Sequence, residues 1–359
     1  MSAIYEMSIR EKLGDIEKSL AEDQRIDYLA NKELILNILE LRERKNVLIL
    51  GHNYMAPLVY QLSNENQRGD SLALSRYAAK ANNPIILFDG VRFMAETAKI
   101  LNPGKKVLIS DLAAGCSLAD NFSAKDVLEY KSKYPGIPVV TYINSYAEVK
   151  AESDYCCTSA NGLEVILHAA REYKKDKVLF IPDSLMGENL QDDLDKDGHA
   201  IDLIYPGKYD KKFARCEVHE KIKPEDIRNI RLQYSMPKRS KDTAIIVHPE
   251  CLKETVAEAD FSGSTSAMVK YIRSNPELKK VYLGTECEMT SNMAAEFPEI
   301  EFIKTCNVFC QHMRKINLEK ILYSLQNELY EINVDKDIVA KARLSIDRML
   351  EIKKWNFQR

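Results

Sequence analysis

Short apolar runs alternate with helix-periodic segments through most of the chain. The runs are rich in Val, Ile and Leu and are bounded by turn residues. Continuous apolar runs of this length suit strands buried on both faces, as in parallel sheets. Because helical periodicity separates most of the runs, the pattern predicts βαβ units. The predicted strands are Asn46–Leu50, Pro84–Phe88, Lys106–Ile109, Ile137–Tyr142, Lys177–Ile181, Ile201–Tyr205, Thr243–Val247, Lys279–Leu283 and Ile300–Lys304.

Helical periodicity also marks both ends of the chain. Apolar residues recur at helical spacing from Ile9 to Leu20 and again from Leu34 to Leu41. The segment after Leu318 shows the same spacing. We therefore expect N-terminal helices within 1–45 and C-terminal helices within 318–359.

The predicted strands form three sets of three with similar features in the same order, which indicates an internal repeat. The first strand of each set ends in a polar triplet, and a hydroxyl residue follows in a turn that opens a helix. The second strand ends near an acid, and a cysteine follows the third strand. In chain order these are the triplets beginning at His52, Tyr142 and His248, the hydroxyls Ser71, Ser159 and Thr265, the acids Asp89, Asp183 and Glu286, and the cysteines Cys116, Cys216 and Cys310. The repeat predicts homologous units over 46–135, 136–240 and 241–317.

Every repeated feature falls at the carboxyl end of a strand, where open α/β sheets bind their ligands. Units arranged around a pseudo-threefold axis bring these ends to one place. The fold class we expect is therefore α/β, with three pseudo-symmetric α/β/α (Rossmann-like, parallel-sheet) units around a central cavity.

The chain contains eight cysteines, and their meaning depends on the compartment. The N-terminus lacks the apolar region of a signal peptide, and no apolar run approaches the ~18 residues of a membrane helix. We therefore expect a cytoplasmic protein, in which cysteines are more often ligands or catalysts than disulfides. Three thiolates meeting in one cavity suit an iron–sulfur cluster, zinc or a cuprous ion.

We favour a [4Fe–4S] cluster on Cys116, Cys216 and Cys310, with one iron left without a protein ligand and free to act as a Lewis acid. The alternative is that these cysteines are small buried hydrophobic residues. Four others, which have no repeat counterparts, are interpreted as packing residues: Cys156, Cys157, Cys251 and Cys287. Cys306 forms a CxxxC with Cys310, a spacing compatible with a redox pair but interpreted as packing.

The acid–base candidates lie at the strand ends. They are His52, Tyr142, His248 and Glu250. We expect desolvation to raise the pKa of Glu250, so that it acts as a base near neutral pH. His168 and His312 lie outside the repeat and are interpreted as ordinary polar residues.

The repeated hydroxyls lie where helices begin. Helix N-termini bind carboxylate and phosphate groups, although Ser and Thr there often serve only as caps. The net charge of −3 implies no field that would gather nucleic acid or an anionic membrane.

The chain contains, in order, the stretches GHNY from Gly51, GDSLALS from Gly69, DLAAGCSLAD from Asp111, TYINSYAEVKAESD from Thr141, CTSAN from Cys157, CEVHEKIKPEDI from Cys216, HPEC from His248, DFSGSTSAMVKY from Asp260 and CQHMRKINLEKIL from Cys310. Together these stretches resemble the quinolinate synthases of de novo NAD biosynthesis. Some positions depart from the family pattern: Asp89 stands where the family often has Cys, and Arg92 where it usually has His. CQHM replaces CPNM.

The resemblance implies three pseudo-symmetric domains and an oxygen-sensitive [4Fe–4S] cluster on the same three cysteines. It implies condensation of iminosuccinate (iminoaspartate) with dihydroxyacetone phosphate to quinolinate, phosphate and two waters. It also raises the expectation of transient contact with an aspartate-oxidising enzyme. The implied catalytic residues are Glu250, Tyr142 and His248. The implied substrate contacts are His52, Ser71, Tyr142, Asn144, Ser159, His248, Pro249, Glu250 and Thr265.

Other readings of three cysteines stay open at this point. They are another three-lobed iron–sulfur enzyme (the terminal reductase of the non-mevalonate isoprenoid route or a diphthamide-forming enzyme), an iron–sulfur sensor, and a zinc enzyme. The HPEC and TSAN stretches disfavour the first. The absence of a helix-turn-helix or basic stripe disfavours the second.

Overall fold

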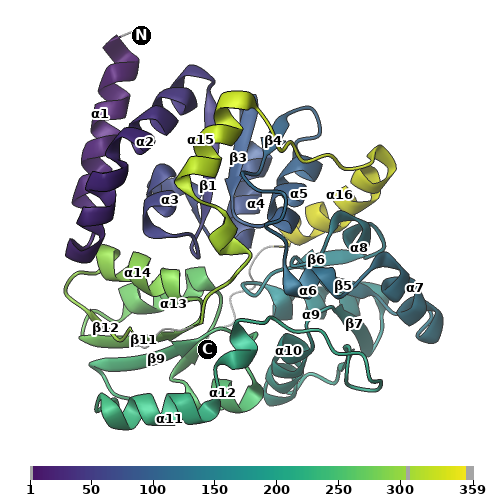
Figure 1. Ribbon diagram of the computed structural model, residues 1–359. Coiled ribbons are helices and arrows are strands. Elements are labelled where there is room, and N and C mark those ends of the chain that lie inside the picture. The colour runs from purple at the N-terminus through teal and green to yellow at the C-terminus, as the bar shows by residue number, and fades with distance from the viewer. Residues whose placement is uncertain (1–2, 305–307, 353–359) are drawn as a thin grey trace.

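A computed structural model of the 359-residue chain describes residues 3–304 and 308–352. It contains three four-stranded sheets, all parallel, each flanked by helices (Figure 1). The first sheet has the order β2-β1-β3-β4, the second β6-β5-β7-β8 and the third β10-β9-β11-β12. The order is the same in all three, so the predicted fold class is confirmed. The boundaries of the three units stay a prediction.

The strands of each sheet come from consecutive stretches of the chain. The first sheet contains β1 (Val47–His52), β2 (Arg68–Gly69), β3 (Ile85–Asp89) and β4 (Lys106–Leu108). The second contains β5 (Val139–Tyr142), β6 (Tyr155–Cys157), β7 (Lys177–Ile181) and β8 (Asp202–Ile204). The third contains β9 (Thr243–Val247), β10 (Phe261–Ser262), β11 (Lys280–Gly284) and β12 (Glu301–Phe302).

Helices connect these strands and extend the chain at both ends. Before and within the first unit they are α1 (Ala3–Lys18), η1 (Glu22–Gln24), α2 (Arg25–Arg44), α3 (Pro57–Leu62), η2 (Glu65–Gln67), α4 (Ser71–Lys80), α5 (Arg92–Leu101), α6 (Ser117–Asp120) and α7 (Ala124–Lys133). In the second they are α8 (Ala147–Ala151), α9 (Gly162–Tyr173), α10 (Ser184–Lys196), η3 (His219–Lys221) and α11 (Pro224–Gln233). In the third and beyond it they are α12 (Lys253–Glu258), α13 (Thr265–Ser274), α14 (Cys287–Glu296), η4 (Met313–Lys315), α15 (Leu318–Asn327) and α16 (Lys336–Glu351).

All the predicted strands are present, and the sequence pattern missed one further strand in each sheet. The missed strands are β2, β6 and β10, which have only two or three residues each. Such segments are too short to show a period, and their parallel pairing partners lie a loop and a helix away in sequence.

These short strands determine where the hydroxyl turns lie. In the first sheet His52 pairs with Gly69, and in the second Tyr142 pairs with Cys157. In the third, Val247 pairs with Ser262. The register therefore places each polar triplet beside the turn that follows the short strand.

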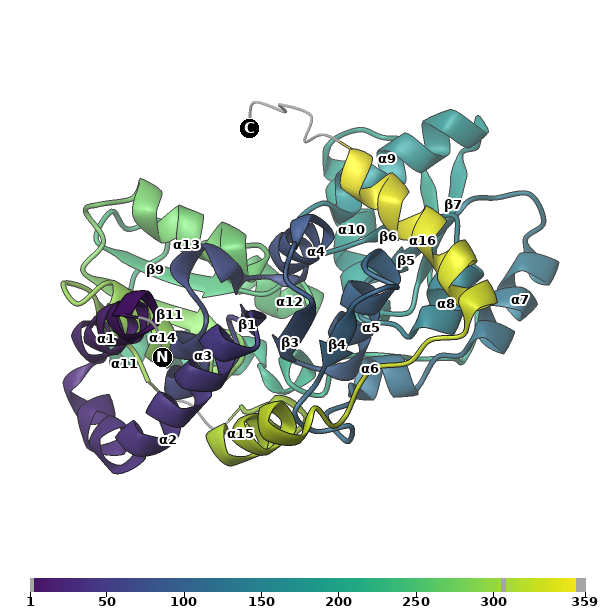
Figure 2. The ribbon, with the colours of Figure 1, turned by 90° about the horizontal axis from the view of Figure 1, so that it is seen from above.

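The C-terminal segment ties the units together. The α15 helix packs on α2, whereas α16 packs on α8 and β6 of the second sheet and on α5 of the first (Figure 2). Its Ser345 hydroxyl donates to the carbonyl oxygen of Lys150 at 2.9 Å. The predicted terminal helices are confirmed, with a non-helical stretch between α15 and α16. None of the helices in the described ranges is both long and apolar enough to cross a lipid bilayer.

Candidate active site

The three repeat cysteines share one local structure. Each sulfur accepts hydrogen bonds from the backbone N–H groups two and three residues later, and each carbonyl oxygen accepts from the N–H four residues later. The sulfur donors are Leu118 and Ala119 for Cys116, Val218 and His219 for Cys216, and His312 and Met313 for Cys310. The carbonyl bonds measure 2.8, 3.2 and 3.1 Å in the same order. Three equivalent turns thus direct two N–H groups at each thiol.

These thiols lie in a strongly desolvated place. Burial raises the pKa of Cys116 and Cys216 well above the usual range and that of Cys310 to about 11, although the N–H donors oppose the shift. The charge of Cys310 raises the pKa of Cys116, and the charge of Cys116 raises the pKa of Cys216, so the sulfurs also interact with one another. Ionising all three therefore requires a compensating positive charge, which a bound metal centre would supply.

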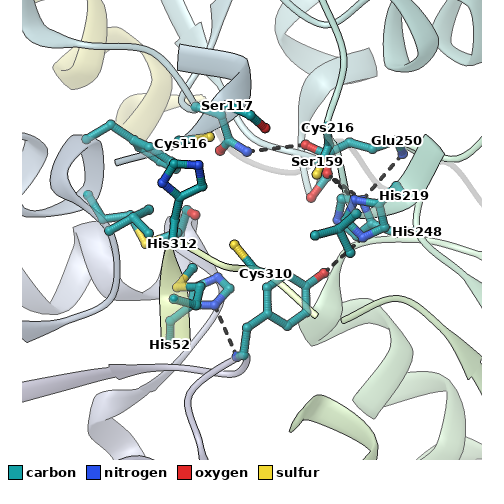
Figure 3. A pocket seen from close by; sticks show the side chains of 18 of the residues that line it. His52, Cys116, Ser117, Ser159, Cys216, His219, His248, Glu250, Cys310 and His312 are labelled. Atoms are coloured by element: carbon teal, nitrogen blue, oxygen red, sulfur yellow. Dashed lines mark hydrogen bonds and ion pairs between the residues drawn. The ribbon is translucent and has the colours of Figure 1, made fainter. Parts of the chain in front are cut away.

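The cysteines line one cavity together with most of the predicted site residues (Figure 3). The predicted contacts that line it are His52, Ser71, Tyr142, Asn144, Ser159, His248, Glu250 and Thr265. Pro249 is not among the lining residues. Its carbonyl oxygen instead accepts a hydrogen bond from Asn189 Nδ2 at 2.9 Å.

The hydroxyl turns are not simple caps. Asp70 caps α4 by accepting from Ala73 N–H at 3.0 Å, and Ser264 caps α13 by accepting from Ala267 N–H at 3.2 Å. Ser71 and Thr265 are the first helical residues, and both line the cavity. Ser159 lies in the turn before α9, whose N-cap is Asn161. None of the three hydroxyl residues is therefore the N-cap of its helix.

Two hydrogen bonds join the first and third units at these turns. Asn53 Nδ2 donates to Thr265 Oγ1 at 2.8 Å, and Ser264 Oγ donates to Asp70 Oδ2 at 3.1 Å. The helix N-termini of the two units are thus fixed relative to each other, with their positive dipole ends at the same cavity.

The carboxylate of Glu250 lies at the centre of a buried polar network. Its Oε2 lies 2.6 Å from His219 Nδ1 and 3.4 Å from His248 Nδ1, and its Oε1 accepts from Asn144 Nδ2 at 3.2 Å. The rings of His219 and His248 stack, with centroids 4.5 Å apart and planes 19° apart. This network lies beside Cys216 (Figure 3).

The expected rise in the pKa of Glu250 is wrong. Burial alone raises that pKa, but the adjacent imidazoles of His219 and His248 outweigh burial, so the pKa lies below its ordinary value. The pKa of His219 is also lowered, chiefly by burial. The sequence did not show that two imidazoles, one at the start of η3 and one directly after β9, would meet one carboxylate.

A chain of hydroxyl groups extends this network toward the first unit. His219 Nε2 lies 2.9 Å from Thr285 Oγ1, and Thr285 Oγ1 lies 2.5 Å from the Tyr54 hydroxyl. Burial raises the pKa of Tyr54 well above its usual range. The arrangement Glu250–His219–Thr285–Tyr54 links a carboxylate, an imidazole and two hydroxyls from all three units.

Sequence reasoning missed His219, Thr285 and Tyr54 as site residues. Tyr54 and His219 stand within quoted motifs, Tyr54 as the third member of a polar triplet and His219 three residues after Cys216. Those positions were the available signal, because third members of the other triplets, Asn144 and Glu250, were both selected. Thr285 had no such signal.

The remaining histidines and cysteines differ in how well they match their expected roles. His168 is half exposed and pairs with Glu172 at 3.0 Å, as expected of an ordinary polar residue. His312 instead lines the cavity, so that interpretation was wrong for it.

Cys156, Cys157 and Cys251 are buried free thiols, as expected. Cys287 is buried but disulfide-bonded, which corrects its interpretation as a packing thiol. Cys306 lies outside the described residues.

A second donor set overlaps the first. One ligand atom each of Cys216, His219 and Glu250 lie within 4.8 Å of one another, a group able to hold a single metal ion. In that set His219 Nδ1 and Glu250 Oε2 already contact each other at 2.6 Å, whereas each of the three cysteine sulfurs accepts from two backbone N–H groups. The residues present therefore fit a cluster on three thiolates.

Three parallel α/β units that direct thiols, imidazoles and helix N-termini into one cavity define a three-unit α/β enzyme. A family model described as Quinolinate synthetase A protein matches residues 36–351. The chain therefore belongs to this family.

Curated relatives agree over nearly the whole chain. It is 42% identical to the quinolinate synthase of Caulobacter vibrioides (strain NA1000 / CB15N) over 327 residues, which cover 91% of this chain and 84% of that protein. It is 42% identical to quinolinate synthase 2 of Mesorhizobium japonicum over 316 residues, covering 88% and 90%. It is 40% identical to that of Xylella fastidiosa (strain 9a5c) over 345 residues, covering 96% and 93%.

Proposed function

We propose that this enzyme is a quinolinate synthase of de novo NAD biosynthesis in the cytoplasm. It condenses iminosuccinate with dihydroxyacetone phosphate to give quinolinate, phosphate and two waters. The observation that carries this proposal is the cavity itself, where three equivalent thiols face hydroxyl turns at helix N-termini. Two carboxylates and one phosphate are the substrate groups that such turns suit.

Cys116, Cys216 and Cys310 are the residues that would hold a [4Fe–4S] cluster. When bound, the cluster supplies a Lewis-acidic iron without a protein ligand, which suits a dehydrating reaction. The fit rests on the six N–H groups directed at the three sulfurs, because such donors stabilise thiolates in a buried place. The two waters released match this chemistry.

Substrate binding falls to the turns and strand ends. Ser71, Ser159 and Thr265 hold carboxylate or phosphate oxygens, with their helix N-termini adding favourable charge. Burial lowers the pKa of His52 to about 4, so its ring is neutral and acts as a hydrogen-bonding group. Its Nδ1 accepts from Tyr54 N–H at 3.2 Å, which leaves Nε2 to carry a proton toward the cavity.

Proton handling falls to the network around Glu250. A carboxylate that contacts two imidazoles and an amide is a weak base, so Glu250 is better suited to orient His219 and His248 than to accept the substrate proton. The imidazoles and the hydroxyl of Tyr142, whose pKa burial and the Glu250 charge raise, then exchange protons with the substrates.

The first test is anaerobic reconstitution of the full chain with iron and sulfide. We expect close to four irons and four sulfides per chain, and quinolinate formation from the two substrates. A colourless protein that binds zinc at Cys216, His219 and Glu250 and incorporates no iron would favour the single-ion site instead. Iron analysis and a quinolinate assay on the same sample separate the two outcomes.

Replacing Glu250 with Gln tests the proton-handling network. The amide keeps the shape but removes the charge that orients both imidazoles, so kcat should fall by about 10²-fold or more, while iron content stays unchanged. The matched control is Glu254→Gln, an exposed residue of α12.

The double variant Glu250→Gln/His219→Gln distinguishes an orienting role from an independent one. When two groups act as a unit, the effects of replacing them are not additive. The double variant should therefore lose little more kcat than the more strongly affected single variant. Full activity in Glu250→Gln with its cluster intact, or a strictly multiplicative loss in the double variant, would contradict the proposed arrangement.

We also propose that iminosuccinate reaches this enzyme from an aspartate-oxidising enzyme during transient contact. Imines hydrolyse in water, so a short path favours the condensation. Mixing the two enzymes and adding a large excess of a catalytically dead copy of this chain tests the contact. A falling quinolinate yield supports it, and an unchanged yield argues for free diffusion.

A further inference from the structure

One position breaks the threefold pattern of the cysteine turns. The residue two after each cysteine donates its N–H to the sulfur, and in the first two units it is the buried apolar Leu118 or Val218. In the third unit it is His312, whose side chain is 20% exposed and lines the cavity. A polar side chain where two equivalent turns carry apolar ones suggests a function beyond packing.

The side chain of His312 forms part of the cavity wall. Within the described part of the chain its buried Nδ1 atom has no hydrogen-bond partner. A Cβ placed on Gly115 would lie 3.5 Å from this nitrogen, which is an ordinary van der Waals contact, so Gly115 packs beside the ring. The ring projects toward the same space as Cys116 and Cys310 (Figure 3).

Glu217 meets His312 from the second unit. Its Oε1 lies 3.8 Å from His312 Nε2, beyond hydrogen-bonding distance, and this buried oxygen has no hydrogen-bond partner among the described residues. Both side chains line the cavity. The pair therefore places Nε2, a ring nitrogen that can donate, beside an oxygen that accepts, with no direct hydrogen bond between the two atoms.

The geometry points to His312 and Glu217 as a binding site for a substrate hydroxyl group, beside the cluster cysteines. A hydroxyl both donates and accepts, and so satisfies both residues, whereas Glu217 would repel a carboxylate or phosphate. This inference rests on the proposed function, because the hydroxyl it assigns is that of the three-carbon phosphate. The hydroxyl turns then hold the phosphate end of the same molecule.

The test compares two stable phosphates that differ in hydroxyl groups. Glycerol 3-phosphate and propyl phosphate are titrated into the reconstituted protein by calorimetry under anaerobic conditions. We expect the wild type to bind glycerol 3-phosphate about tenfold more tightly, because propyl phosphate leaves both His312 and Glu217 without a hydrogen-bond partner. His312→Ala should reduce this preference to about twofold and raise KM for dihydroxyacetone phosphate, with KM for iminosuccinate nearly unchanged.

Two further variants separate this role from a structural one. His312→Asn retains a side-chain donor and should keep part of the preference, and its iron content should equal that of the wild type. His168→Ala removes a surface histidine of α9 and should change neither the preference for glycerol 3-phosphate nor the iron content.

The inference is overturned if the wild type binds both phosphates equally, or if His312→Ala keeps the full preference. If His312→Ala fails to hold iron, the test uses His312→Asn and Glu217→Gln instead. The same ratio of affinities for glycerol 3-phosphate and propyl phosphate is then measured, and a full preference in both variants overturns the inference. A wild type that favours glycerol 3-phosphate yet forms no quinolinate would refute the proposed reaction and leave the hydroxyl site supported.

Discussion

The equivalent strands β3 of the first unit and β11 of the third end near the same kind of residue, yet the two acids have different surroundings. Glu286 accepts from Glu288 N–H at 2.6 Å and from Cys310 N–H at 3.2 Å. Asp89 is fully buried, and neither of its oxygens has a hydrogen-bond partner among the described residues. A repeated position in the sequence therefore does not imply a repeated role.

Their pKa values reflect the same contrast. Burial raises the pKa of Glu286 to about 8, while the two N–H donors limit the shift. For Asp89 burial acts alone and raises the pKa well above its usual range. Asp183, at the equivalent position of the second unit, is intermediate, since Oδ1 accepts from Met186 N–H at 2.7 Å and Oδ2 has no described partner. The three acids form a graded series from fully partnered to unpartnered.

The largest effect is expected for Glu286→Ala. Two buried N–H groups lose their acceptor, at about 1–3 kcal/mol each, partly offset because a buried carboxyl group is removed. We expect the free energy of unfolding to fall by about 2–4 kcal/mol, and iron content to fall because the Cys310 turn loses its anchor. Urea unfolding and iron analysis measure the two effects.

Glu286→Gln is the matched control, because its carbonyl oxygen replaces one of the two acceptors. It should show about half the loss of stability. An alanine variant as stable as the wild type would show that these hydrogen bonds do not hold the Cys310 turn.

The next effect is a gain in stability for Asp89→Cys. A carboxyl group buried without partners is replaced by a small apolar thiol, so unfolding should require about 1–3 kcal/mol more at pH 6. Asp89→Asn is the control, because the amide is still buried without partners. Urea unfolding at several pH values is the measurement.

This gain should grow with pH. In the wild type the unfolded chain ionises Asp89 above about pH 3.9, whereas the folded chain keeps the proton until its raised pKa is reached. Wild-type stability is therefore lost as pH rises through this range, by up to about 1.4 kcal/mol per pH unit. A gain that is constant from pH 5 to pH 8 would mean that Asp89 is not held protonated.

The smallest effect is expected for Asp183→Asn. The amide oxygen can keep the cap to Met186 N–H, and burial already disfavours the charged form of Asp183. We expect a change below about 1 kcal/mol, compared with a loss of about 1 kcal/mol for Asp183→Ala, which removes the cap. A large loss in the Asn variant would indicate that the charge of Asp183 matters.

The sequence determined much of this protein by itself. The apolar runs predicted nine of the twelve strands that the structure describes, and the order of triplet, hydroxyl, acid and cysteine predicted three units that share a cavity. Strands and turns can be predicted from the sequence because strand burial and turn composition depend on neighbouring residues. The cysteines, Ser71, Thr265 and His248 all follow from that pattern.

Which groups meet across units depends on how the three units pack, and no local pattern predicted it. Glu250, expected to be a base with a raised pKa, instead contacts His219 from the loop after Cys216, and the pKa is lowered. His312 and Glu217 come together from different units, and so do Thr285 and Tyr54. Burial and charge act through space over a few ångströms, whereas these partners lie tens to hundreds of residues apart in the chain. The sequence therefore predicted the cavity and its cysteines, and the packing of the three units decided its electrostatics.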